Sequence, residues 1–240
     1  MSVRSAVRRI PALGAIKIAI LVGGISNAEA DSISLSVLLE RFDQAQETTR
    51  SMVAKFTEEK RLRLLLEPRT TRGEFVFLRP NMVRWEYAGP TPRIFVLTES
   101  RYLAYDPGTR RAEDVDIKAF VGKRLFRFLG FGQSSSELAK YYDLEISPDN
   151  VISGTHLLML TPRKRRVRDR LTSMRIWVDA RTFLPRQVAY EDSGGDSTLL
   201  RFDEIRVNSG VNSDRFDLIL PVGVAVSRSF EGFSIGDRGF

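Results

Sequence analysis

The residues of this 240-residue chain that could do acid–base chemistry form no recognisable catalytic motif. The single histidine, His156, lies in an apolar run typical of a strand, and no nucleophile or orienting carboxylate forms a catalytic motif with it. The acidic pairs Glu58-Glu59 and Asp114/Asp116 could act as acid–base groups or hold a cation. Solvated strand edges and loops suit these acids better, and a structural or surface role suits His156 better. The pattern therefore favours a protein without catalytic residues, and an exported hydrolase that depends on His156 is the weaker alternative.

The composition also excludes several kinds of metal and cofactor site. The chain has no cysteine, which excludes disulfides, thiolate-bound metals and a lipid anchor on an N-terminal cysteine. One histidine cannot build a multi-histidine metal site. Gly130-Phe131-Gly132 lacks the third glycine and the preceding strand of a nucleotide-binding loop, and indicates the end of a helix. We expect no metal and no cofactor.

The first thirty residues have the pattern of a secretory signal peptide. Basic residues at Arg4, Arg8 and Arg9 precede a mostly apolar run from Ile10 to Ile25, and Ala28-Glu29-Ala30 is a small-x-small cleavage pattern. The alternative, a membrane anchor, is disfavoured because the run is shorter than the ~20 residues of a span and contains a lysine. We expect cleavage after Ala30 and one domain over 31–240. Part of the net charge of +7 belongs to the predicted signal peptide, so the rest of the chain has only a small excess of positive charge. We therefore do not expect nucleic acid as a partner.

Hydrophobic periodicity predicts a mainly β domain with helices in two places. A helix is expected over 34–48, an amphipathic helix from 117 to about 129, and a short helix over 134–141. Because strands follow one another without intervening helices, they should pair antiparallel in one curled sheet of ten or eleven strands. The expected strands are 52–57, 73–79, 82–87, 94–97, 102–105, 142–147, 155–162, 171–179, 184–191, 197–207 and 216–226.

Large apolar side chains share one face of two consecutive predicted strands. Period two places Phe75 and Phe77 on the same face as Arg79, and it places Val83, Trp85 and Tyr87 together on the next strand. Two interpretations are open. The residues are an ordinary core packed against helices, or they line the interior of a half-barrel, where ligand sites form.

The densest charge run of the chain is Arg163-Lys164-Arg165-Arg166-Val167-Arg168-Asp169-Arg170, between two predicted strands. One interpretation is a solvated hairpin tip. The other is a docking loop, carried by Arg163, Lys164, Arg165 and Arg166, for phospholipid headgroups or an acidic protein face.

The motifs together resemble the LolA family of periplasmic lipoprotein carriers. Phe56-Thr57-Glu58, the string Gly73-Glu74-Phe75-Val76-Phe77-Leu78-Arg79-Pro80-Asn81-Met82-Val83-Arg84-Trp85, and Tyr105-Asp106-Pro107 carry the resemblance, mainly over 50–107. It implies one open, incomplete antiparallel barrel of about ten or eleven strands. An N-terminal helix and a helical lid at about 115–142 accompany this barrel. The cavity would be lined by Phe75, Phe77, Val83, Trp85 and Tyr87, and the lid face would be Phe120, Val121, Leu125, Phe128 and Leu129. The resemblance further implies that Arg79 tethers the lid through its backbone.

The resemblance also implies function and partners. The expected protein is a monomeric periplasmic carrier that moves acylated lipoproteins from an inner-membrane lipoprotein-releasing complex to an outer-membrane acceptor. The lack of cysteine favours the soluble carrier over the lipid-anchored receptor of similar fold. A LolA-like lipid-binding or envelope-sensing module with another lipid or protein cargo is the alternative.

Overall fold

The computed structural model describes residues 33–117, 132, 134–169 and 171–229. The chain divides into two units, Met1–Ser32 and Ile33–Phe240, and the first lies outside the described residues, as does the predicted signal peptide. The five predicted lid-face residues also lie outside them: Phe120, Val121, Leu125, Phe128 and Leu129. Among the helices of the described ranges, none combines the length and apolar character needed to cross a membrane.

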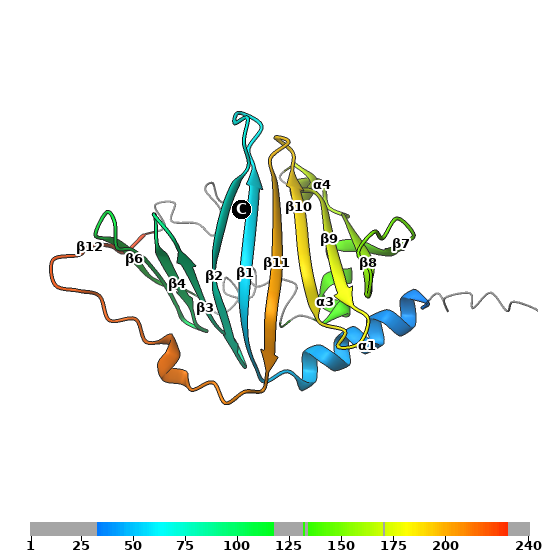
Figure 1. Cartoon of the computed structure of the whole chain (residues 1–240), viewed down its shortest axis with the longest axis horizontal. Coiled ribbons are helices and arrows are strands. Elements are labelled where there is room, and N and C mark those ends of the chain that lie inside the picture. The colour runs from blue at the N-terminus through cyan, green and yellow to red at the C-terminus, as the bar shows by residue number, and fades with distance from the viewer. Residues whose placement is uncertain (1–32, 118–131, 133, 170, 230–240) are drawn as a thin grey trace, which may run out of the picture. The chain divides into compact units, whose positions relative to one another are not determined.

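Twelve strands form one unclosed sheet, which confirms the expected mainly β, open-barrel class (Figure 1). The strands are β1 (Ser51–Arg61), β2 (Arg69–Leu78), β3 (Met82–Ala88), β4 (Arg93–Leu97), β5 (Arg101–Asp106), β6 (Arg111–Asp116), β7 (Tyr142–Ser147), β8 (Thr155–Pro162), β9 (Leu171–Asp179), β10 (Pro185–Asp192), β11 (Ser197–Val207) and β12 (Ala225–Ser227). Their order is β12-β6-β5-β4-β3-β2-β1-β11-β10-β9-β8-β7. All pairs are antiparallel except β12 with β6.

Helices α1 (Leu35–Thr48) and α3 (Ser135–Ala139) match the two expected helices that fall within the described residues. The Ser34 hydroxyl caps α1 by accepting a hydrogen bond from the Val37 amide at 3.4 Å. Leu38 and Phe42, four residues apart, are fully buried in the main core together with Leu138 of α3. We call the sheet face that packs against these helices the inner face.

A strap of chain after β11 crosses the opposite, outer face of the sheet. Its apolar side chains, Val211, Phe216, Leu218 and Leu220, pack on a second core formed by Val53, Val76, Val96 and Leu103. In Figure 1 this orange segment runs from the end of β11 to β12. The strap contains the 3-10 turn η1 (Ser213–Phe216).

The expected strand 216–226 is therefore wrong except at its end, where Ala225–Ser227 forms β12. Alternating apolar residues are equally suited to a strand and to an extended strap that packs every second side chain. The structure also adds β6, which the sequence did not predict because its six residues include four charged ones. Two of these, Glu113 and Asp114, are buried.

Asp114 lies near the edge of the sheet, but it is buried and not solvated as expected. Its carboxylate accepts hydrogen bonds from Arg101 at 2.7 and 3.0 Å and from Arg228, just beyond β12, at 2.6 Å. The hydrogen bonds from Arg101 are the largest cause that lowers the pKa of Asp114 below its usual value. The carboxylate thereby keeps its charge, and its attachment to the β12 segment, into mildly acid solution.

Candidate functional site

A cluster of aromatic rings occupies the centre of the inner face. It comprises Phe56 of β1, Phe75 of β2, Trp85 and Tyr87 of β3, and Phe202 of β11. The centroid of the Trp85 ring lies 4.8 Å from that of Phe56 and 4.9 Å from that of Phe75. These are the tilted and edge-on arrangements that aromatic pairs prefer. The register that pairs Phe75 with Trp85 across β2 and β3 brings these rings together.

Gly73 makes room for this cluster. It pairs with Phe56 on one side and with Tyr87 on the other. A Cβ atom at position 73 would lie 2.6 Å from the Phe56 ring and 1.9 Å from the Glu86 carbonyl oxygen. The Phe56 ring therefore lies over the glycine, where it reaches both Trp85 and Tyr87, at centroid distances of 4.8 and 5.0 Å.

The structure brings all five predicted cavity residues together in this core. Each of them is buried in the main core: Phe75, Phe77, Val83, Trp85 and Tyr87. Their role in lining an acyl cavity stays a prediction. Sequence reasoning missed Phe202, which contacts both Phe75 and Trp85, because its strand follows β3 by more than a hundred residues. The pairing of β11 with β1 alone brings it there.

A buried polar group lies at one end of the cluster. The Tyr87 hydroxyl donates to Glu58 Oε2 at 3.0 Å, and Lys60 Nζ lies 3.2 Å from Glu58 Oε1. Burial first, and the Glu58 carboxylate second, raise the pKa of Tyr87 well above its usual value, so the phenol stays protonated and donates. The expectation that Glu58 lies at a solvated edge is wrong, because Lys60 and Tyr87 satisfy the carboxylate inside the sheet.

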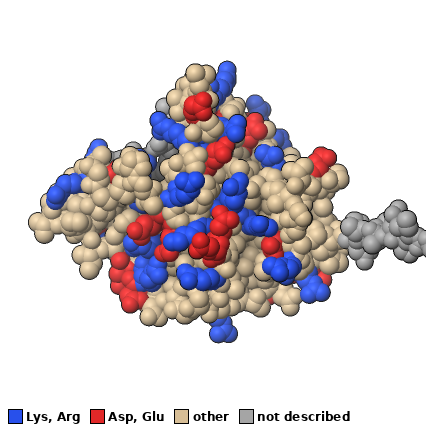
Figure 2. All heavy atoms as spheres, viewed as in Figure 1, with Lys and Arg blue, Asp and Glu red and all other residues tan. Residues whose placement is uncertain are grey.

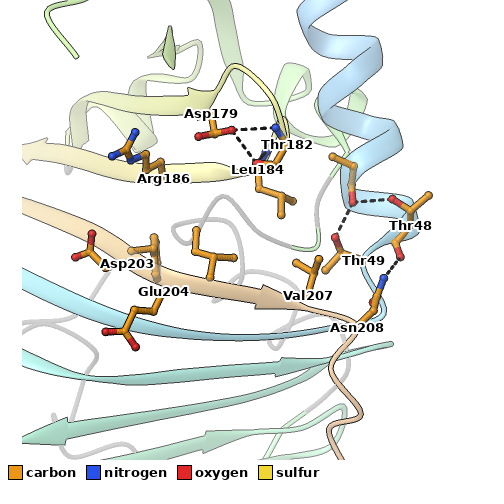
Figure 3. A pocket seen from close by; sticks show the side chains of 13 residues that line it. Thr48, Thr49, Asp179, Thr182, Leu184, Arg186, Asp203, Glu204, Val207 and Asn208 are labelled. Carbon is orange, nitrogen blue, oxygen red and sulfur yellow. Dashed lines mark hydrogen bonds between the residues drawn. The ribbon is translucent and has the colours of Figure 1, made fainter. Parts of the chain in front are cut away.

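A pocket of about 360 Å³ lies next to the aromatic cluster (Figure 3). It is lined by the last turn of α1, the β9–β10 turn and the end of β11: Ala45, Thr48, Thr49, Asp179, Thr182, Leu184, Arg186, Phe202, Asp203, Glu204, Ile205, Val207 and Asn208. None of the five predicted cavity residues lines it. Phe202 is shared by the pocket and the aromatic cluster, so the pocket reaches the edge of the inner core.

The Arg79 guanidinium binds the C-terminal turn of α1. It donates to the carbonyl oxygen of Gln46 at 2.6 Å and to that of Thr49 at 2.9 Å. Carbonyls at a helix C-terminus lack intrahelical partners and carry partial negative charge, so a guanidinium suits them. Arg79 thus contacts backbone carbonyls of a covering helix, but the helix is α1. Its predicted contact with the lid is untested for residues 118–131, which carry the predicted lid face and lie outside the described ranges.

Helix α1 in turn holds residues in the later, described part of the predicted lid region, which spans about 115–142. The Gln46 side-chain oxygen accepts a hydrogen bond from the Gly132 amide at 2.9 Å. The Asp43 carboxylate accepts from the Ser135 amide at 2.5 Å and from its hydroxyl at 2.6 Å, at the start of α3. A continuous chain of contacts therefore leads from Arg79, through Gln46, to Gly132 within the predicted lid region.

The remaining candidates lie away from the cluster. His156 is half-buried and stacks on Phe183, with ring centroids 6.4 Å apart. The basic run forms the loop between β8 and β9, as expected, with a short helix α4 (Arg165–Arg168). Arg163, Lys164 and Arg165 are exposed, and Arg163 pairs with Asp143 at 2.7 Å. The side chain of Arg166 is outside the described set. Docking by this loop stays a prediction.

The fold and its inner face define an open antiparallel half-barrel with an aromatic interior, partly covered by helices. The model of the family "Outer membrane lipoprotein carrier protein LolA" matches residues 47–218, and the chain belongs to that family. By that description, the family is one of lipoprotein carrier proteins.

Individual relatives agree with this assignment. An outer-membrane lipoprotein carrier protein of Halorhodospira halophila is 25% identical over 206 residues, which cover 86% of this chain and 90% of the relative. A carrier of the same name from Cupriavidus pinatubonensis is 24% identical over 159 residues, which cover 66% of this chain and 71% of that relative. A solved structure of an uncharacterized conserved protein from Thermus thermophilus superposes with a TM-score of 0.53 at 12% identity, covering 80% of this chain and 97% of that one. The last likeness shows the fold alone.

Proposed function

We propose that this protein is a periplasmic carrier that shelters the acyl chains of lipoproteins between its inner sheet face and its covering helices. The observation that supports this most directly is the aromatic cluster around Trp85, which gives the inner face of a LolA-family sheet a large apolar surface. In the proposed cycle the carrier takes its cargo from an inner-membrane releasing complex and delivers it to an outer-membrane acceptor.

The energies involved suit a carrier that must also release its cargo. Burial of acyl chains contributes roughly 0.8 kcal/mol per methylene, so a chain with about fourteen methylenes represents about 11 kcal/mol. The hydrogen bonds of Arg79 and Gln46 to helix and loop backbone contribute about 1 kcal/mol each. Bound acyl chains therefore outweigh these contacts and hold the covering segments open. Transfer to an acceptor of higher affinity then needs no nucleotide hydrolysis by this chain.

The cargo itself tests the proposal. Protein purified from the periplasm of the producing bacterium should carry lipoproteins that native mass spectrometry and lipid analysis identify by their acylated N-termini. Recovery of free phospholipid, of glycolipid or of a single non-acylated partner protein would contradict lipoprotein carriage. Such a result would indicate the lipid-binding or envelope-sensing alternative.

Replacement of Arg79 by leucine should slow cargo release. The variant loses both hydrogen bonds to the C-terminal turn of α1, which weakens the closed, empty state by about 1–2 kcal/mol relative to the loaded one. Release of a bound lipopeptide to acceptor vesicles should fall about fivefold or more, and hydrogen exchange at the end of α1 should speed up.

Two further variants sharpen this test. Arg79→Lys keeps the charge but cannot reproduce the two-pronged contact, so its release rate should lie between those of the wild type and the leucine variant. Arg201→Leu, a change at an exposed arginine of β11, should leave release unchanged. Equal release by Arg79→Leu and Arg201→Leu would refute the proposed role of Arg79.

A further inference from the structure

The tip of the β1–β2 hairpin exposes a row of leucines. Leu64 is 94% exposed and Leu66 is 101% exposed, while Leu65 between them is 42% exposed. The amide of Leu65 donates to the Leu62 carbonyl at 2.8 Å, which fixes the turn. Single exposed leucines are ordinary, but three in succession on a projecting turn form an apolar point that water solvates poorly.

Basic side chains surround this point. Arg61, Arg63 and Arg69 flank the leucines and are all exposed. Figure 2 shows the hairpin as the uppermost projection, with mainly tan atoms at its end and both blue and red atoms beside them. An apolar tip bordered by cations is the pattern by which soluble proteins enter the interface of an anionic bilayer.

Two neighbouring loops are fastened to this hairpin. The Arg63 amide donates to Asp196 Oδ1 in the β10–β11 turn at 2.7 Å. In the same turn the Ser193 hydroxyl donates to the Asp169 carbonyl at 2.6 Å, which ties on the basic β8–β9 loop. Figure 1 shows the β1–β2 and β10–β11 turns side by side at the top of the sheet. We call loops 61–69, 163–169 and 192–197 the basic rim; they contain eight arginine or lysine residues and four acidic ones.

We propose that the basic rim docks the protein on an anionic phospholipid bilayer, with Leu64 and Leu66 inserted among the lipid headgroups and upper acyl chains. The charge of the rim favours an anionic surface. The leucines project from a convex tip, which a deformable bilayer accommodates without a matching pocket. A folded protein partner would have to offer an apolar pocket for them.

The inference does not rest on the proposed carriage of lipoproteins. The rim contains none of the five aromatic-cluster residues, and docking brings any cargo that the inner face holds close to a membrane. Docking and acyl binding are therefore separable properties of the same chain, and they are measured by different assays.

The test is co-sedimentation of the periplasm-purified protein with vesicles. Wild-type protein should bind vesicles of phosphatidylcholine mixed with phosphatidylglycerol, and the binding should weaken as salt is raised. The double variant Leu64→Ser/Leu66→Ser should bind them at least tenfold more weakly, since burial of one leucine is worth about a factor of ten or more. Lys164→Gln/Arg165→Gln should reduce the preference for anionic over neutral vesicles, because it halves the positive charge excess of the rim.

A matched control comes from exposed apolar residues elsewhere. Val151, in the loop at the opposite end of β8 from the rim, and Ile219, in the strap, are each 90% exposed. Val151→Ser/Ile219→Ser should bind vesicles as the wild type does. The proposal is overturned if the wild type does not sediment with anionic vesicles, or if the leucine double variant binds as well as this control. Displacement of a fluorescent acyl probe should be the same in every rim variant as in the wild type. If the wild type does not bind the probe at all, that result contradicts the carrier function and leaves membrane docking unaffected.

Discussion

Replacement of Trp85 by glutamate is expected to abolish acyl binding. Trp85 is fully buried at the centre of the inner-face aromatic cluster, where it contacts Phe56, Phe75 and Phe202. A carboxylate there exchanges apolar surface for a charge whose burial costs several kcal/mol without a partner. Displacement of a fluorescent hydrophobic probe by a lipopeptide measures the effect, and the wild-type signal should disappear.

The second tryptophan provides a matched control. Trp177 is also buried, but it belongs to a separate outer cluster with Leu157 and Ala189. Neither indole Nε1 has a hydrogen-bond partner within the described residues, so neither substitution breaks an indole hydrogen bond. Trp177→Glu should destabilise the protein without removing probe binding. Unchanged displacement in Trp85→Glu would contradict an inner-face site.

A milder substitution protects this test against unfolding. Val83 lies on the same face of β3 and is 3% exposed. Val83→Asn introduces a neutral polar group at the predicted cavity wall, and it should weaken probe binding while the circular dichroism of the sheet is retained.

Replacement of Gly73 by alanine should be among the most destabilising single-methyl changes in the chain. The added Cβ would lie 1.9 Å from the Glu86 carbonyl oxygen, which is backbone and cannot swing aside, and 2.6 Å from the Phe56 ring. Overpacking of this kind costs about 3 kcal/mol and displaces Phe56 from Trp85. Urea unfolding should show the loss of stability, and probe binding should fall with it.

Gly108→Ala is the control for this change. Its Cβ would meet only the Asp106 side chain, at 3.2 Å, in an exposed turn. It should leave the unfolding free energy within about 0.5 kcal/mol of the wild type. A Gly73→Ala variant as stable as Gly108→Ala would show that the β2–β3 pair can separate without cost.

Period-two patterning was sufficient to predict most strands and the faces of β2 and β3. Phe75 and Trp85 meet as expected because alternation and register together determine which face each side chain occupies. The same alternation led to the wrong prediction of a strand over 216–226. Phe216, Leu218 and Leu220 alternate as a strand would, but their side chains pack onto the sheet from a strap that is not a strand. Local pattern does not distinguish these two uses of an extended chain.

The contacts of α1 could not be predicted from the sequence. Gln46 is only 4% exposed, which is unusual for a glutamine, and its backbone carbonyl and its side chain serve different partners. Both partners, Arg79 and Gly132, are far away in sequence. Arg79 was identified only through the family resemblance, which did not specify α1 as the helix that it binds. The burial of Glu58 could not be predicted from the sequence either, because its partner Tyr87 comes close only when β1 and β3 lie in one sheet.

The strand order has a consequence for how the chain acquires its structure. Strands β1 to β6 form one run of consecutive hairpin neighbours and β7 to β11 form another, and the two runs meet only where β1 pairs with β11. That seam joins residues as far apart as Met52 and Val207. Because loop-closure entropy delays distant pairings, each run can assemble locally while the seam must wait for the late part of the chain. Until the seam forms, the edges of β1 and β11 are unpaired, so the partly folded chain is prone to pair with other chains through these edges.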